Sequence, residues 1–232
     1  MKNALLLDFN GVVVDDEPLH FASLRDVLAG EGIAMDQATY YADYLGLDDH
    51  ASFREAYRRA GRPLEPRTAQ RLLGRKATAY AGLAERHLPI VPGVGGFVRR
   101  AATHWCVAIV SGALRSEISL GLARAGISDV VSAVVSAEDV GISKPDPAGY
   151  RLALSLLAAG PAGAPATRSV VVEDSLPGLF AARALGAGCV MLTTSHGAGA
   201  LAAADGVWES FEGHDPEELT SLSRPVESAH RV

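Results

Sequence analysis

One short apolar segment near the start of the chain restricts the possible folds more than any other feature. Residues 5–7 are all leucine, Asp8 follows them directly, and Gly11 comes three residues later. The run is too short for a membrane span or a free helix, which favours a buried strand of a parallel sheet. Such a strand would deliver the Asp8 carboxylate into a crevice. An ordinary turn, where Asp is common, is the alternative interpretation.

Beyond residue 96 the chain alternates apolar runs with helical patterns. We expect strands at 107–110, 130–135, 169–172 and 189–192, with helices between them. This alternation implies right-handed crossovers and a parallel sheet that helices cover on both faces. The predicted fold class is therefore α/β, a Rossmann-like doubly wound parallel sheet.

The segment between the first strand and this alternating region has a different character. It is alanine-rich and helical without a convincing strand, and a proline- and glycine-rich stretch at 89–96 closes it. We therefore predict a discontinuous α/β core domain of residues 1–14 and 88–232. Residues 15–87 are predicted to form an inserted α-helical cap domain.

Basic residues gather within this insertion. Between Arg54 and Lys76 there are eight of them, against Glu55 and Glu65. Solvated helix faces are the simpler explanation. The sharper alternative is that Arg75 or Lys76 faces an anionic substrate.

The overall charge and the absence of a long apolar run limit the partners that we expect. The formal net charge of −6 argues against a general nucleic-acid binder, whose surface should be basic. No signal peptide or membrane span is recognised, so we expect a cytoplasmic protein without a membrane partner. We expect a small-molecule substrate and a monomer or weak homodimer.

Polar residues follow several of the predicted strands at their carboxyl ends, where ligands bind in such folds. Clustered carboxylates cannot all stay ionised without a cation, and oxygen ligands suit Mg²⁺. A lysine and a serine can hold phosphate oxygens, while an aspartate can act as a nucleophile. Taken singly, each residue has an ordinary alternative as a helix cap or a solvated loop residue. The residues concerned are Asp8, Ser111, Lys144, Glu173 and Asp174.

Together these motifs resemble the four signatures of the haloacid dehalogenase superfamily. Asp8-Phe9-Asn10-Gly11 is similar to the first signature, Ser111 to the second and Lys144 before Pro145 to the third. The fourth is Glu173-Asp174-Ser175, with Gly178 three residues later. The sequence at 15–20 resembles the beta-phosphoglucomutase-like branch, which has a helical cap and includes many small-molecule phosphatases.

The resemblance implies a role for each matching residue. Asp8 would be the nucleophile, and Ser111 and Lys144 would bind the transferring phosphate. Mg²⁺ would be held by Asp8, Asp174 and the backbone carbonyl of Asn10, with Glu173 holding a metal-bound water. Further candidates for substrate binding are Gly112, His20 and Lys76.

Asn10 departs from the family pattern, which has a second aspartate there for proton transfer. An amide can form hydrogen bonds but cannot exchange a proton in this way. Three explanations compete: a slow or specialised phosphatase, a binding protein that has lost catalysis, or an aspartate exchanged for asparagine in this chain. His20, Asp15 or Asp16 could replace the missing group, although His20 could equally be a packing residue.

The function that we expect is a Mg²⁺-dependent phosphatase of a small phosphorylated metabolite, acting through an aspartyl-phosphate. A catalytically impaired phosphometabolite-binding protein is the non-enzyme alternative. A beta-phosphoglucomutase is disfavoured, because Asp48-Asp49 stands where that enzyme has an arginine for its second phosphate. A haloacid dehalogenase needs no metal, so Glu173-Asp174 argues against it.

Overall fold

The computed structural model describes residues 3–45, 47–160 and 166–226, and it divides the chain into two compact units. The first comprises Met1–Asp15 with Pro89–Val232, and the second comprises Asp16–Leu88. Among the described residues, no helix combines the length and apolar character needed to cross a membrane.

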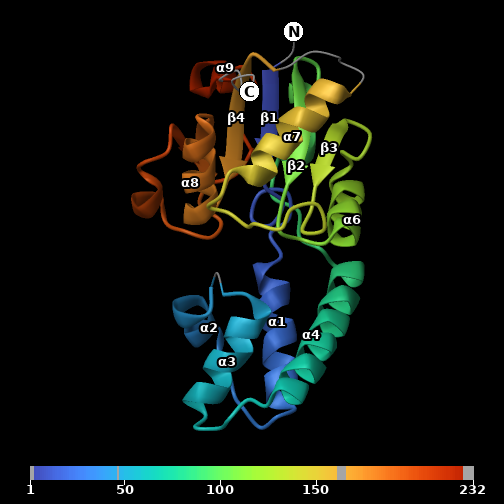
Figure 1. Ribbon diagram of the computed structural model, residues 1–232, viewed down its shortest axis with the longest axis vertical. Coiled ribbons are helices and arrows are strands. Elements are labelled where there is room, and N and C mark those ends of the chain that lie inside the picture. The colour runs from blue at the N-terminus through green and yellow to red at the C-terminus, as the bar shows by residue number, and fades with distance from the viewer. Residues whose placement is uncertain (1–2, 46, 161–165, 227–232) are drawn as a thin grey trace. The chain divides into compact units, whose positions relative to one another are not determined.

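The first unit is built on a seven-stranded sheet (Figure 1). Six strands are parallel, in the order β3-β2-β1-β4-β5-β6, and the short β7 pairs antiparallel with the start of β4. The predicted α/β class is confirmed. The strands are β1 (Asn3–Leu7), β2 (Trp105–Val110), β3 (Val131–Val135), β4 (Arg168–Glu173), β5 (Gly188–Leu192), β6 (Gly206–Trp208) and β7 (Arg224–Pro225).

Helices of this unit pack against the sheet through apolar side chains. Tyr150 and Leu157 of α7 and Leu179 of α8 share one core cluster with Leu6 of β1 and Val171 of β4. Their burial accounts for the near-continuous apolar strands in the sequence. The helices are α5 (Val94–Ala101), α6 (Arg115–Ala125), α7 (Ala148–Ala159), α8 (Leu176–Leu185) and α9 (Glu218–Leu222), with a 3₁₀ turn at Ala198–Leu201.

The strand order places a topological switch point between β1 and β4. From β1 the chain crosses outward to β2 and β3, then returns to the other side of β1 to add β4, β5 and β6. Leu7 pairs with Val172, and the Asp8 N–H donates to the Val172 carbonyl at 3.0 Å. The residues that follow β1 and β4 are therefore neighbours, at the position where open α/β sheets bind ligands.

The second unit is wholly helical within its described residues. Leu24, Leu28, Phe53 and Leu72 are fully or almost fully buried in its own core cluster. Asp36 and Asp48 begin two of the helices by accepting hydrogen bonds from backbone N–H groups, as N-cap residues do. The helices are α1 (Glu17–Ala29), α2 (Gln37–Asp43), α3 (Asp49–Arg59) and α4 (Pro66–Arg86).

Candidate active site

Three buried carboxylates meet at the switch point of the sheet. Asp8 follows β1, Glu173 is the last residue of β4, and Asp174 comes next. Each offers an oxygen within 4.8 Å of the others, and all three residues are at most 8% exposed. The structure therefore gathers the acidic residues that the sequence placed at separate strand ends.

Lys144 brings a positive charge into this cluster. Its Nζ lies 2.9 Å from Asp8 Oδ1 and 2.5 Å from Glu173 Oε1. Burial lowers the lysine pKa, but the charges of Asp8 and Glu173 outweigh burial and raise the pKa above its usual value. Lys144 is therefore protonated, and one ammonium group faces three carboxyl groups.

The excess of carboxyl groups changes their acidity. Burial, followed by the charge of Glu173, raises the pKa of Asp8 to about 6. Burial, followed by the charges of Asp8 and Glu173, raises the pKa of Asp174 to about 8. Glu173 is buried too, yet the charge of Lys144 and several hydrogen bonds hold its pKa below the usual value. A divalent cation would relieve the repulsion at Asp8 and Asp174, and this all-oxygen donor set fits Mg²⁺.

Glu173 is saturated by donors from the protein itself. Its Oε1 accepts from the Tyr150 hydroxyl at 2.7 Å in addition to Lys144. Its Oε2 accepts from the Ser175 hydroxyl at 2.9 Å and from the backbone N–H groups of Asp174 and Ser175. A Cβ atom at Gly178 would lie 1.9 Å from the Glu173 carboxyl carbon, which explains the glycine in this motif. These contacts favour Asp8 and Asp174 over Glu173 as direct metal ligands.

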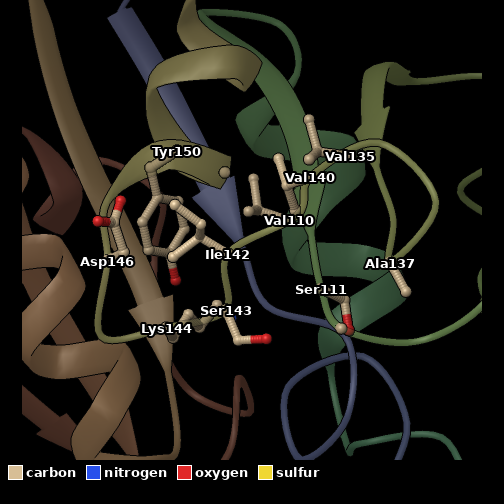
Figure 2. Close-up of a pocket in the computed structure, with 12 residues that line it drawn as sticks. Val110, Ser111, Val135, Ala137, Val140, Ile142, Ser143, Lys144, Asp146 and Tyr150 are labelled. Atoms are coloured by element: carbon tan, nitrogen blue, oxygen red, sulfur yellow. The ribbon is translucent and has the colours of Figure 1, made fainter.

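Ser111 and Asn10 lie beside each other at the ends of β2 and β1. The Ser111 hydroxyl is 3.4 Å from Asn10 Oδ1, and it accepts from the Ala113 N–H at 3.1 Å. Ser111, Gly112 and Lys144 line a cavity of about 210 Å³ that also has apolar walls (Figure 2). The cavity thus places an open space next to two of the predicted phosphate-binding side chains.

His20 and Lys76 belong to a separate polar cluster within the helical unit. Lys76 Nζ lies 2.7 Å from His20 Nδ1 and forms an ion pair with Asp49, although the lysine is only 3% exposed. His20 Nε2 is 3.3 Å from Asp16, whose carboxylate accepts a hydrogen bond from Tyr80. Both ring nitrogens of His20 therefore already have neighbours in this unit.

Most of the basic residues in this unit have acidic partners close by. Arg75 and Arg71 both pair with Glu31, and Arg58 and Arg59 pair with Glu55. These pairs support the simpler explanation of the basic segment, because its charges are largely compensated within the helical unit.

Three residues that contact the site carboxylates had no clear signal in the sequence. Tyr150 fits the apolar stripe of α7, so its bond to Glu173 was not predicted. Thr194 and Ser195 follow β5 outside any recognised motif, yet both hydroxyls lie against Asp174. The sequence signal for Thr194 and Ser195 is their position just after a predicted strand.

The raised pKa values predict how stability depends on pH. Because folded Asp174 keeps its proton up to about pH 8, whereas an ordinary aspartate releases it near 3.8, the folded state binds more protons in this window. The metal-free protein should therefore lose stability as pH rises from about 4 to about 8, on the order of a few kcal/mol. Mg²⁺ should restore more stability at pH 8 than at pH 5. Thermal melts with EDTA or Mg²⁺ across this range measure both effects.

Two variants separate this effect from other titrating groups. Asp174→Asn should make the decline shallower, because the amide does not titrate and the smaller contribution of Asp8 remains. Asp205→Asn removes a carboxylate that accepts from the Cys189 N–H at the opposite end of β5, and it should leave the slope unchanged. An equally steep decline in Asp174→Asn would contradict the assignment of the effect to Asp174.

The chain resembles several known proteins in sequence. A family model for haloacid dehalogenase-like hydrolases matches residues 2–186. Hexitol phosphatase B of Escherichia coli (strain K12) is 28% identical over 187 residues, covering 78% of this chain and 79% of that protein. Validoxylamine A 7'-phosphate phosphatase of Streptomyces hygroscopicus subsp. limoneus is 37% identical over 97 residues, 42% of this chain. That match spans only 43% of the streptomycete protein.

The fold is also shared with solved structures. CbbY from Rhodobacter sphaeroides, crystallised in complex with phosphate, superposes with a TM-score of 0.73 at 22% identity. The superposition covers 92% of this chain and 96% of CbbY. With the family model matching most of its length, the chain belongs to the haloacid dehalogenase-like hydrolase family.

Proposed function

We propose that this protein is a Mg²⁺-dependent phosphatase that hydrolyses a monoester of a small phosphorylated metabolite. The observation that carries the proposal is the convergence of Asp8, Lys144 and Asp174 at the switch point of the sheet. A buried nucleophile, a fixed cation and a cation-binding carboxylate are the parts that phosphoryl transfer requires. Membership of a hydrolase family supports the same reaction class.

In this proposal Asp8 carries the covalent step. One carboxylate oxygen of Asp8 bonds to phosphorus while the ester P–O bond breaks. The leaving alkoxide takes its proton from water, because the Asn10 amide has none to transfer. Water then attacks the phosphorus of the aspartyl-phosphate and releases inorganic phosphate and free Asp8. Lys144, already 2.9 Å from Asp8, and Ser111 hold the phosphate oxygens.

The oxygen atoms available at the strand ends suggest how Mg²⁺ would be held. Asp8 and Asp174 would hold Mg²⁺ together with the backbone carbonyl of Asn10. When bound, Mg²⁺ neutralises the charge on the carboxylates and on the phosphate. Glu173 keeps Lys144 in place through the 2.5 Å contact, and it reaches the metal at most through water.

We further propose that the helical unit serves as the cap that selects the substrate. The ammonium group of Lys76 is buried and already paired with Asp49, so it is a poor receptor for a second phosphate. Asp48 and Asp49 add negative charge where a beta-phosphoglucomutase would have an arginine for its second phosphate. Monophosphates of sugars or polyols are therefore better candidates than bisphosphates, and a polyol phosphate is consistent with the name of one relative.

Asn10 favours one alternative, a phosphometabolite-binding protein with little turnover. The Asn10 amide lies beside Ser111, where it can accept a hydrogen bond but cannot protonate a leaving alkoxide. Loss of a general acid–base group typically costs ~10²–10⁴ in rate. A protein with this deficit could retain binding while hydrolysing alkyl esters slowly.

The test is phosphate release from a panel of esters, with Mg²⁺ or with EDTA. The panel contains p-nitrophenyl phosphate, sugar, hexitol and cyclitol monophosphates, a sugar bisphosphate and, as a dehalogenase substrate, chloroacetate. We expect release from at least one monophosphate, reduced by at least ~10²-fold when the metal is removed. Tight binding without release would favour the binding protein, and metal-independent chloride release would favour a dehalogenase.

A further inference from the structure

The segment after β5 supplies two hydroxyl groups to the metal-site carboxylate. The Ser195 hydroxyl donates a hydrogen bond to Asp174 Oδ2. The Thr194 hydroxyl donates to the Gly11 carbonyl at 2.7 Å and lies 3.5 Å from the same Asp174 oxygen. The segment after β5 is thus connected to the Asp174 carboxylate, about 20 positions earlier, and to the Gly11 backbone, about 180 positions earlier.

We propose that Ser195 is a positioning residue that orients Asp174 for cation binding, with Thr194 fixing the loop that carries it. The inference rests on the proposed function, because it assumes that Asp174 is a metal ligand. Ser195 would contact a metal ligand without binding the metal itself, a role that neither the sequence motifs nor the names of the relatives assign. Hydrogen bonds of this kind orient metal ligands and raise metal affinity.

The geometry restricts the Asp174 carboxylate on two sides. A Cβ atom at Gly11 would lie only 1.8 Å from Asp174 Oδ2, so the carboxylate packs directly on the glycine backbone. Gly11 has φ of +72°, a conformation that a side chain would strain. With Oδ2 held between Gly11 and the Ser195 hydroxyl, Oδ1 is the oxygen left for a cation.

Thr194 contributes differently from Ser195. A hydroxyl has one proton to donate, and the 2.7 Å bond directs the Thr194 proton to Gly11 instead of Asp174. Thr194 thereby connects the loop after β5 to the loop after β1. Loss of the Thr194 hydroxyl should affect metal binding less than loss of the Ser195 hydroxyl, which contacts the ligand itself.

Titration calorimetry of Mg²⁺ into the metal-free full-length protein tests this proposal. Ser195→Ala should weaken binding by ~10–100-fold, the range typical for an outer contact of a metal ligand. Ser195→Thr, which keeps a hydroxyl, should recover most of the affinity, and Thr194→Val should show a smaller loss. Ser155→Ala is the matched control, because that hydroxyl donates to the Arg151 carbonyl of its own helix, α7. Circular dichroism melts identify any variant that fails to fold.

The Mg²⁺ affinities of two variants distinguish failure of the positioning role from failure of the proposed metal site. Unchanged Mg²⁺ affinity in Ser195→Ala, with weakened affinity in Asp174→Asn, would refute the positioning role and leave the metal site standing. Unchanged affinity in Asp174→Asn would refute the metal site and the inference together. If Ser195→Ala does not fold, Ser195→Cys tests the positioning role instead. A thiol donates a weaker hydrogen bond than a hydroxyl, so this variant should bind Mg²⁺ less tightly than Ser195→Thr.

Discussion

Replacing Asp8 with asparagine is expected to reduce phosphate ester hydrolysis by roughly 10⁴–10⁶-fold, the scale on which enzymes lose rate without their covalent nucleophile. The amide nearly matches the carboxylate in shape, so the strand end and its 3.0 Å backbone bond to Val172 should persist. What is lost is the anionic oxygen that attacks phosphorus. Single-turnover phosphate release measures the rate, and mass spectrometry after acid quenching tests for the phosphorylated aspartate.

The loss should extend to every substrate, because each ester is cleaved by the same attack of Asp8 on phosphorus. Asp205→Asn provides the control, since it makes the same chemical change at the opposite end of the sheet. Its activity should stay close to that of the unchanged protein. Substantial activity in Asp8→Asn would show that another group attacks phosphorus, or that water attacks directly.

The core of the site could be predicted from sequence because parallel strands impose their own geometry. Once residues 5–7 and 170–172 are recognised as neighbouring buried strands, the residues after them must lie at one edge of the sheet. Asp8, Glu173 and Asp174 were therefore found without knowing any distance. Lys144 lies on a loop, and its place was predicted by the resemblance to a family motif.

The remaining partners depend on helix packing and loop conformation, which periodicity does not encode. Lys76 reads as a surface residue of a basic helix, yet it is 3% exposed because Asp49 and His20 converge on it from two other helices. Tyr150 reads as an apolar core residue, and its ring is buried as expected, but its hydroxyl reaches Glu173. In both cases the side chain has an apolar part that can be buried and a polar end that makes the contact.

Replacing Asn10 with aspartate should have an effect that depends on the leaving group. The leaving group of an aryl phosphate is a weakly basic phenolate, which needs little protonation. The leaving group of a sugar phosphate is an alkoxide, which must be almost fully protonated as it departs. The unchanged protein should therefore show an unusually high ratio of aryl to alkyl rates. Asn10→Asp should raise the alkyl rate by up to ~10²–10⁴-fold and the aryl rate by less. Steady-state rates for p-nitrophenyl phosphate and a hexitol phosphate measure this ratio.

The matched control lies at the start of β1, the strand that leads to Asn10. Asn3→Asp makes the same change at the other end of β1, where the Asn3 side chain accepts from Thr167, and should leave the ratio unaltered. His20 is the competing proton carrier, but its ring nitrogens lie 2.7 Å from Lys76 and 3.3 Å from Asp16 within the helical unit. An unchanged alkyl rate in Asn10→Asp, with activity lost in His20→Ala, would assign proton transfer to His20. Asn10 would then not limit hydrolysis, because His20 would already deliver the proton to the leaving alkoxide.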